Sequence, residues 1–130
     1  MPKSYAMSFE RNVAVPMRDG TILYADVYRP AMPGRYPVLL QRTPYDKASG
    51  IGPGAFAVRA AGEGYAVVVQ DVRGRWQSEG TFYAFPNERQ DGFDTAVWIN
   101  EQPWANGRIG MFGQSYVGLT QWQAALGGAP

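Results

Sequence analysis

Cysteine and histidine are both absent from this chain of 130 residues. Without cysteine, the chain has no disulfide, no thiolate metal site and no cysteine nucleophile. Without histidine, it lacks the commonest general base, the commonest metal ligand and the usual pH switch. We therefore expect neither a metal nor a cofactor, and any catalytic mechanism for this chain must find its proton acceptor elsewhere.

A charge excess and a long apolar run are also missing. Lysine and arginine number 12 and the acidic residues 11, which gives a net charge of +1. Nucleic-acid-binding proteins normally carry a marked basic excess, so we expect no nucleic-acid partner. The longest apolar runs, such as 66–69, are too short to span a membrane. Residues 1–11 lack the apolar stretch of a secretory signal. We expect a cytoplasmic protein without membrane contact.

The composition is that of one folded domain, with 45% hydrophobic and 18% charged residues. An Asp-Gly turn at 18–20 predicts an antiparallel hairpin between strands at 12–17 and 22–28. After the hairpin, the expected strands and helices alternate along the chain, which predicts an α/β fold with a mainly parallel sheet and helices on both faces. The elements expected after the hairpin are strands 37–41, 65–72 and 108–112, and helices 55–61, 87–100 and 117–126.

Two finer predictions concern the later helices. Asn87 and Gln90 have the spacing of a capping box, which would begin the helix that reaches residue 100. In the last helix, Leu119, Trp122 and Leu126 are spaced i, i+3 and i+7, which predicts that they form its apolar stripe.

The turn at 113–118 has the clearest chemical content. Ser115 lies where a strand is expected to become a helix, and such a sharp turn exposes a serine Oγ at the end of the strand. The common pattern is G-x-S-x-G, whereas here Val117 takes the fifth position and Gly118 follows it. Two alternatives stay open: an ordinary glycine-rich turn, and a dinucleotide fingerprint at Gly113, Ser115 and Gly118, in which the serine side chain would obstruct the pyrophosphate.

An oxyanion hole is the second expected feature. In α/β-hydrolases one donor is the backbone N–H after the nucleophile, which here belongs to Tyr116, and the other comes from the loop after the third strand. That loop contains Tyr45, whose hydroxyl would take the place of a backbone N–H. The alternative for Tyr45 is an aromatic ring packed beside Pro44.

The sequence resembles the cocaine esterase-like (CocE/NonD) hydrolases, relatives of the X-Pro dipeptidyl-peptidases and α-amino acid ester hydrolases. The segments that carry this resemblance span most of the chain and are 15–20 (VPMRDG), 41–47 (QRTPYDK), 64–74 (GYAVVVQDVRG), 78–80 (SEG) and 107–116 (GRIGMFGQSY). The family motif is G-x-S-Y-x-G, so the position of Gly118 follows the family pattern.

The resemblance implies an α/β-hydrolase fold and acyl transfer from an ester or amide substrate to water. It implies that Ser115 is the nucleophile that forms the acyl-enzyme, and that the Tyr45 hydroxyl and the Tyr116 N–H form the oxyanion hole. Asp71 and Arg73 match a recurrent strand-end motif, which we interpret as a structural pair that holds the loop.

The family triad also needs an Asp and a His after the serine, and the chain contains no match for either. We therefore expect residues 1–130 to be the N-terminal part of a catalytic domain, ending after the helix that follows the nucleophile. Lys47 is the one base candidate near Ser115, and its polar surroundings do not favour the neutral amine. The open sheet edge would be covered by a missing C-terminal part or another copy of the chain. The contrasting hypothesis is a non-catalytic fragment or assembly module.

Overall fold

The computed structural model describes residues 5–49, 54–113 and 115–130. Every expected strand and helix is present, most of them a few residues longer or shorter than the sequence predicts. In chain order the elements are β1 (Met7–Pro16), β2 (Ile22–Pro30), β3 (Tyr36–Thr43), α1 (Gly54–Gly62), β4 (Ala66–Asp71), α2 (Glu88–Asn100), β5 (Ala105–Met111) and α3 (Tyr116–Leu126).

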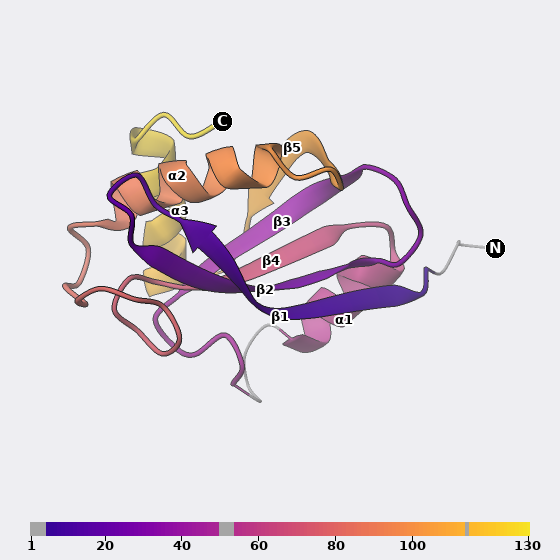
Figure 1. Ribbon diagram of the computed structural model, residues 1–130, viewed down its shortest axis with the longest axis horizontal. Coiled ribbons are helices and arrows are strands. Elements are labelled where there is room, and N and C mark those ends of the chain that lie inside the picture. The colour runs from indigo at the N-terminus through magenta and orange to yellow at the C-terminus, as the bar shows by residue number, and fades with distance from the viewer. Residues whose placement is uncertain (1–4, 50–53, 114) are drawn as a thin grey trace.

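The strands form one mixed sheet with the order β1-β2-β4-β3-β5 (Figure 1). The pairs β4–β3 and β3–β5 are parallel, whereas β1–β2 and β2–β4 are antiparallel. The α/β prediction, with an antiparallel hairpin preceding a parallel sheet, is therefore confirmed. Within the described part of the chain, no helix is long and apolar enough to cross a membrane.

The apolar core lies on both faces of the sheet, because β4 is buried along its whole length. On one face, Val67 and Val69 pack with the alanines of α1. On the other face, Val68 packs with Leu40 and with Ile99 of α2. An unbroken run of valines is typical of a strand that is buried on both faces, and β4 is such a strand.

Helix α3 lies beside α2 (Figure 1), and its packed face differs from the predicted one. Val117, Thr120 and Ala124 are the buried residues of α3, whereas Trp122 is 73% exposed and Leu126 63% exposed. A Cβ added to Gly92 of α2 would lie 2.9 Å from the Ala124 Cβ, so the helices approach too closely for large side chains. The predicted stripe of Leu119, Trp122 and Leu126 is therefore wrong.

The capping-box prediction for α2 is also wrong. Asn87 makes no side-chain capping hydrogen bond, and its backbone is already helical, with φ −92° and ψ −7°. An N-cap side chain normally reaches the free N–H groups from a non-helical backbone, so this geometry removes the box. The first residue of α2, Glu88, instead points into the protein interior, where it is 2% exposed.

Candidate active site

Ser115 lies between the end of β5 and the start of α3, and it is exposed. Its backbone has φ 60° and ψ −130°, a conformation that non-glycine residues rarely adopt. Such strain persists only where the surrounding structure enforces it, and it is concentrated at functional sites. The predicted placement of Ser115 on a sharp strand-to-helix turn is confirmed, while its role as nucleophile stays a prediction.

Gly113 makes this turn possible. Its φ is 124°, and a Cβ at this position would lie 2.2 Å from Val117 Cγ1. By contrast, a Cβ on Gly118 would meet only the Gly113 carbonyl oxygen, at an ordinary 3.7 Å. The amide of Gln121 donates to the same carbonyl at 3.0 Å. The turn therefore needs a glycine before the serine far more than one after it.

Tyr45, on the loop after β3, brings its hydroxyl to within 3.4 Å of Ser115 Oγ. The two residues are 70 positions apart in the sequence. At this length the contact is weaker than a normal hydroxyl hydrogen bond of about 2.7 Å. Catalytic hydrogen bonds are often long before substrate arrives, and an oxyanion bound beside Ser115 would lie within reach of the Tyr45 hydroxyl.

Tyr116 is the first residue of α3, where backbone N–H groups have no acceptor within the helix. Its side chain contacts α2 and the loop that precedes α2. The hydroxyl donates to Glu88 Oε1 at 3.3 Å and accepts the Phe85 N–H at 3.1 Å. Burial and the nearby Glu88 carboxylate raise the pKa of this hydroxyl, which keeps it protonated as a donor.

The Tyr45 loop is fastened to β4 and to the loop that follows β4. The Lys47 N–H donates to Asp71 Oδ1 at 2.9 Å, and the Trp76 indole donates to the Pro44 carbonyl at 3.0 Å. Within the loop, the Tyr45 N–H donates to Thr43 Oγ1 at 3.0 Å. These bonds lie on both sides of Tyr45 and restrict where its ring can point.

Lys47 differs from its predicted setting, because it is 2% exposed. Its ammonium lies 3.1 Å from Asp26 Oδ1 and 3.8 Å from Asp71 Oδ2, and it donates to Asn12 Oδ1 at 2.6 Å. A bulge in β1 next to Asn12 brings that residue to the cluster. Burial raises the pKa of Asp71, although the hydrogen bonds from Lys47 and Gln77 oppose the shift. Lys47 therefore lies in a buried cluster with two carboxylates, and not in the polar surroundings that the sequence suggested.

Asp71 and Arg73 do not pair with each other, which corrects the predicted structural pair. Asp71 holds the Tyr45 loop, as described above. Arg73 instead donates to Asp91 on α2 at 2.8 Å and to Asp19 in the hairpin turn at 2.9 Å. Each residue therefore fixes a loop, but through different partners.

A buried polar network beneath the turn escaped the sequence analysis. Arg42 of β3 is fully buried; it donates to Glu88 Oε2 at 2.6 Å and to Gln70 Oε1 at 2.6 Å. Thr95 also donates to the Gln70 oxygen, at 3.1 Å. The one available signal was Arg42 at the end of an apolar strand, since a buried arginine requires a buried acceptor.

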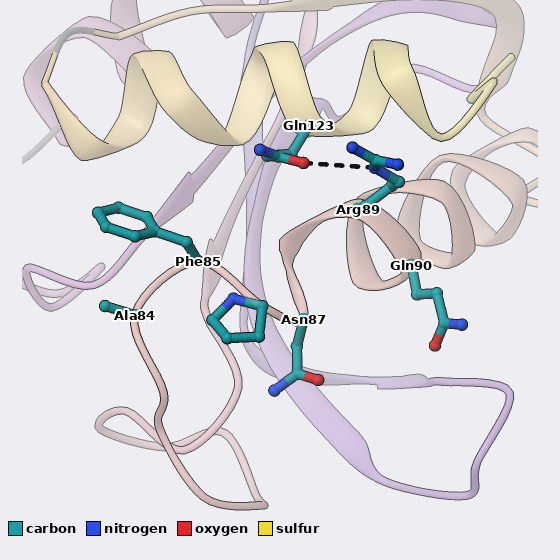
Figure 2. A pocket seen from close by; sticks show the side chains of 7 residues that line it. Ala84, Phe85, Asn87, Arg89, Gln90 and Gln123 are labelled. Atoms are coloured by element: carbon teal, nitrogen blue, oxygen red, sulfur yellow. Dashed lines mark hydrogen bonds between the residues drawn. The ribbon is translucent and has the colours of Figure 1, made fainter.

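A hollow of about 650 Å³ lies between the loop at 84–87, α2 and α3 (Figure 2). Arg89 donates to Gln123 at 3.4 Å across its wall. Neither Ser115 nor Tyr45 is among the described residues that line it. Phe85, which does line it, stacks on Tyr116 with ring centroids 5.1 Å apart. The hollow therefore adjoins the candidate site through this ring pair without containing it.

The described residues contain no cluster of acidic side chains suited to hold a metal ion. The groups that the candidate site presents are the hydroxyls of Ser115 and Tyr45 and the backbone N–H at the start of α3.

Comparison with known proteins gives a consistent family assignment. The model of the X-Pro dipeptidyl-peptidase (S15) family matches residues 19–130. Cocaine esterase of Rhodococcus sp. (strain MB1 Bresler) is 48% identical over 127 residues, which cover 93% of this chain and 22% of the esterase.

Solved structures show the same likeness. A CocE/NonD family hydrolase from Staphylococcus aureus is 28% identical with a TM-score of 0.83, over 92% of this chain and 25% of that protein. An α-amino acid ester hydrolase is 29% identical with a TM-score of 0.77, over 95% of this chain and 24% of that protein. The chain therefore spans about a quarter or less of the length of each of these three relatives.

Proposed function

Because the chain belongs to the X-Pro dipeptidyl-peptidase (S15) family, in which CocE/NonD hydrolases are its relatives, we propose that it carries the nucleophile and oxyanion hole of a serine hydrolase. As a base takes its proton, Ser115 Oγ attacks the acyl carbon of an ester or amide and forms a tetrahedral intermediate. This intermediate expels the alcohol or amine, which takes up the proton, and leaves the acyl group on Ser115. Water then releases the acyl group. During both steps the Tyr45 hydroxyl and the Tyr116 N–H stabilise the negative oxygen.

One observation carries this proposal: the Tyr45 hydroxyl lies 3.4 Å from Ser115 Oγ, and the serine backbone is held at φ 60°. An ordinary glycine-rich turn does not require an exposed tyrosine from a distant loop beside its serine. A dinucleotide site does not favour this arrangement either, since the serine and tyrosine side chains take the space that a pyrophosphate would need.

The proton of Ser115 needs an acceptor, and this chain contains no histidine. We propose that polypeptide outside residues 1–130 supplies the triad Asp and His, and that residues 1–130 alone are inactive. Ionised carboxylates are weak substitutes because their pKa values lie near 4 in the absence of perturbation. The competing function is a non-catalytic module, which the absence of histidine favours.

The names of two relatives support an ester as the substrate class. Cocaine esterase, 48% identical, acts on an ester, as its name states, and the α-amino acid ester hydrolase does so too. We therefore favour an ester over a peptide as the substrate.

The test compares residues 1–130 with a version of the same chain extended through the next Asp and His. Each is assayed for p-nitrophenyl acetate hydrolysis and for covalent labelling by a fluorophosphonate. We expect Ser115-dependent turnover and labelling in the extended version alone, both abolished by Ser115→Ala. Ser8→Ala, on the distant strand β1, is the matched control.

Two results would contradict parts of this proposal. Rapid Ser115-dependent turnover by residues 1–130 alone would show that the base lies within the chain. Inactivity of both versions, with folding confirmed by circular dichroism, would favour the non-catalytic module.

A further inference from the structure

The buried network beneath the turn is poorly explained by stability alone. Arg42 is fully buried and Glu88 is 2% exposed, so their ion pair loses nearly all its hydration. Replacing such a pair with apolar residues of similar volume often leaves a protein equally or more stable. Arg42 Nη2 and Gln70 Nε2 also have no partner in the described structure. A network that is costly to bury suggests a role in specifying geometry.

The network connects directly to the residue after Ser115. Glu88 binds Arg42 through Oε2, and through Oε1 it accepts the hydroxyl of Tyr116 at 3.3 Å. The Thr120 hydroxyl of α3 donates to the Val117 carbonyl at 2.7 Å and also lies 3.3 Å from the Arg42 backbone carbonyl. Glu88 therefore holds the first residue of α3 against α2. The Arg42 carbonyl contacts the same helix one turn later, from β3.

The Tyr116 ring is fixed from its other sides as well. Phe85 stacks on it with an interplanar angle of 20°, and the Phe85 N–H donates to its hydroxyl. Phe85 itself has a φ of 79°, unusual for an aromatic residue. The Tyr116 side chain is therefore held at its ring and at its hydroxyl, immediately beside the strained backbone of Ser115.

We propose that Glu88, held by Arg42, is a positioning residue that acts through the Tyr116 hydroxyl to fix the direction of the Tyr116 N–H and the strained backbone of Ser115. Glu88 touches neither substrate nor reacting atoms. The catalytic consequence rests on the proposed hydrolase function, but the geometric consequence does not. An N–H that points away from the developing oxyanion loses its contribution, and a misplacement of about 1 Å can cost up to about 100-fold in rate.

The first experiment measures backbone order in residues 1–130 by ¹⁵N relaxation. In the unmodified chain, we expect order parameters of about 0.85 at Ser115 and Tyr116, typical of rigid backbone. Tyr116→Phe removes only the hydroxyl, and Glu88→Gln removes the charge that binds Arg42. Both should lower the order parameters at these residues towards about 0.6. Tyr83→Phe and Glu10→Gln make the same chemical changes at exposed positions and should leave them unchanged.

The second experiment measures kcat and KM in the extended version, per active site titrated with the fluorophosphonate. Tyr116→Phe and Glu88→Gln should each lower kcat by about 10- to 100-fold with little change in KM, and the double variant should lose no more than the worse single variant. A merely structural role would reduce the number of titratable sites and leave kcat per site unchanged.

The outcomes separate the two proposals. Unchanged order at Ser115 and Tyr116 in the Tyr116→Phe chain would overturn the positioning role whatever the activity, and this holds even if Glu88→Gln fails to fold. Lowered order without any hydrolysis in the unmodified extended version would support the positioning role and refute the hydrolase function. Lowered order with unchanged kcat per site would overturn the catalytic consequence of the positioning.

Discussion

At the scale of single residues, the site depends on a contact that no local pattern encodes. Tyr45 comes from the loop after β3, Ser115 follows β5, and the parallel pairing of these strands brings both to one end of the sheet. The Tyr45 side chain is 54% exposed, so its hydroxyl contributes little to stability. An exposed tyrosine beside an exposed serine is better explained by chemistry than by packing.

Tyr45→Phe tests this interpretation in the extended version. Because the change removes one oxyanion donor and leaves the ring in place, we expect kcat to fall by about 10²- to 10³-fold. The thermal midpoint should be unchanged, since the lost hydroxyl is exposed. Tyr83→Phe, at a side chain that is 64% exposed, controls for the loss of a surface hydroxyl. A normal kcat in Tyr45→Phe would show that the Tyr45 hydroxyl is not the second oxyanion donor beside the Tyr116 N–H.

At the scale of elements, two glycines at the same turn have opposite roles. A Cβ at Gly113 would overlap Val117, and the φ of 124° is unfavourable for any other residue. We expect Gly113→Ala to destabilise the protein by at least about 2 kcal/mol. Gly118 lies within α3 with room for a Cβ, so Gly118→Ala should stabilise by up to about 1 kcal/mol, the difference in helix propensity. Urea unfolding of both variants measures the change in the free energy of unfolding. Changes of the same sign in the two variants would contradict the structure.

The hairpin turn is attached to α2 by Arg18 and Asp94. The guanidinium donates to Asp94 Oδ1 at 2.8 Å, and the Arg18 N–H donates to Oδ2 at 2.9 Å. Burial acts to raise the pKa of Asp94, but the hydrogen bonds from Arg18 outweigh it and the net pKa is lowered. A carboxylate with a lowered pKa stabilises the fold above its unfolded pKa, and this contribution is lost as the pH falls through its folded pKa.

Asp94→Asn should therefore destabilise the protein by about 1 kcal/mol at pH 7, a value reduced because the Arg18 side chain is half exposed. The difference from the unmodified chain should shrink as the pH falls below about 4. Urea unfolding at a series of pH values from 7 to 2 provides the measurement. Glu63→Gln removes an exposed carboxylate elsewhere and controls for net charge. A difference that stayed constant over this range would exclude ionisation of Asp94 as its source.

The elements that the sequence predicted well are those with local signals. The hairpin follows from Asp19-Gly20, and the buried strand β4 follows from its run of valines. The phase of α3 was not predictable in this way. The face of α3 that is buried and the face that was predicted to be buried have the same helical period. Which of them packs on α2 depends on the close approach of Gly92 to Ala124.

At the scale of the whole molecule, the interactions that sequence analysis missed are the buried charges between distant segments. Lys47 is buried because β1 and β2 bring Asn12 and Asp26 to it, and Arg42 meets Glu88 across 46 positions. No regular spacing in the sequence identifies such partners, because they come from segments that are far apart in the chain. The turn at Ser115 was predictable from its glycine and serine, whereas the groups that hold it in place became visible only with the fold.

Strand β5 forms one edge of the sheet. In the described structure β5 pairs with β3 and with no other strand, and most of its residues are exposed. An exposed edge presents unpaired N–H and C=O groups that favour pairing with another chain. A groove lined mainly by apolar residues includes Ile109 and Met111 of β5, together with residues of α2, α3 and the segment after α3. We expect residues 1–130 to associate through β5 in a concentration-dependent manner.

Gly110→Lys tests this expectation, because a charge on an edge strand opposes pairing between copies. The position tolerates a side chain, since an added Cβ would lie 3.5 Å from Leu39 Cδ2. Analytical ultracentrifugation should show self-association of the unmodified chain, weakened at least about tenfold by Gly110→Lys, which corresponds to about 1.4 kcal/mol. Thr81→Lys adds the same charge on an exposed loop and should leave association unchanged. Equal weakening by both variants would assign the effect to net charge, and a chain that stays monomeric at every concentration would show that the open edge does not recruit a second copy.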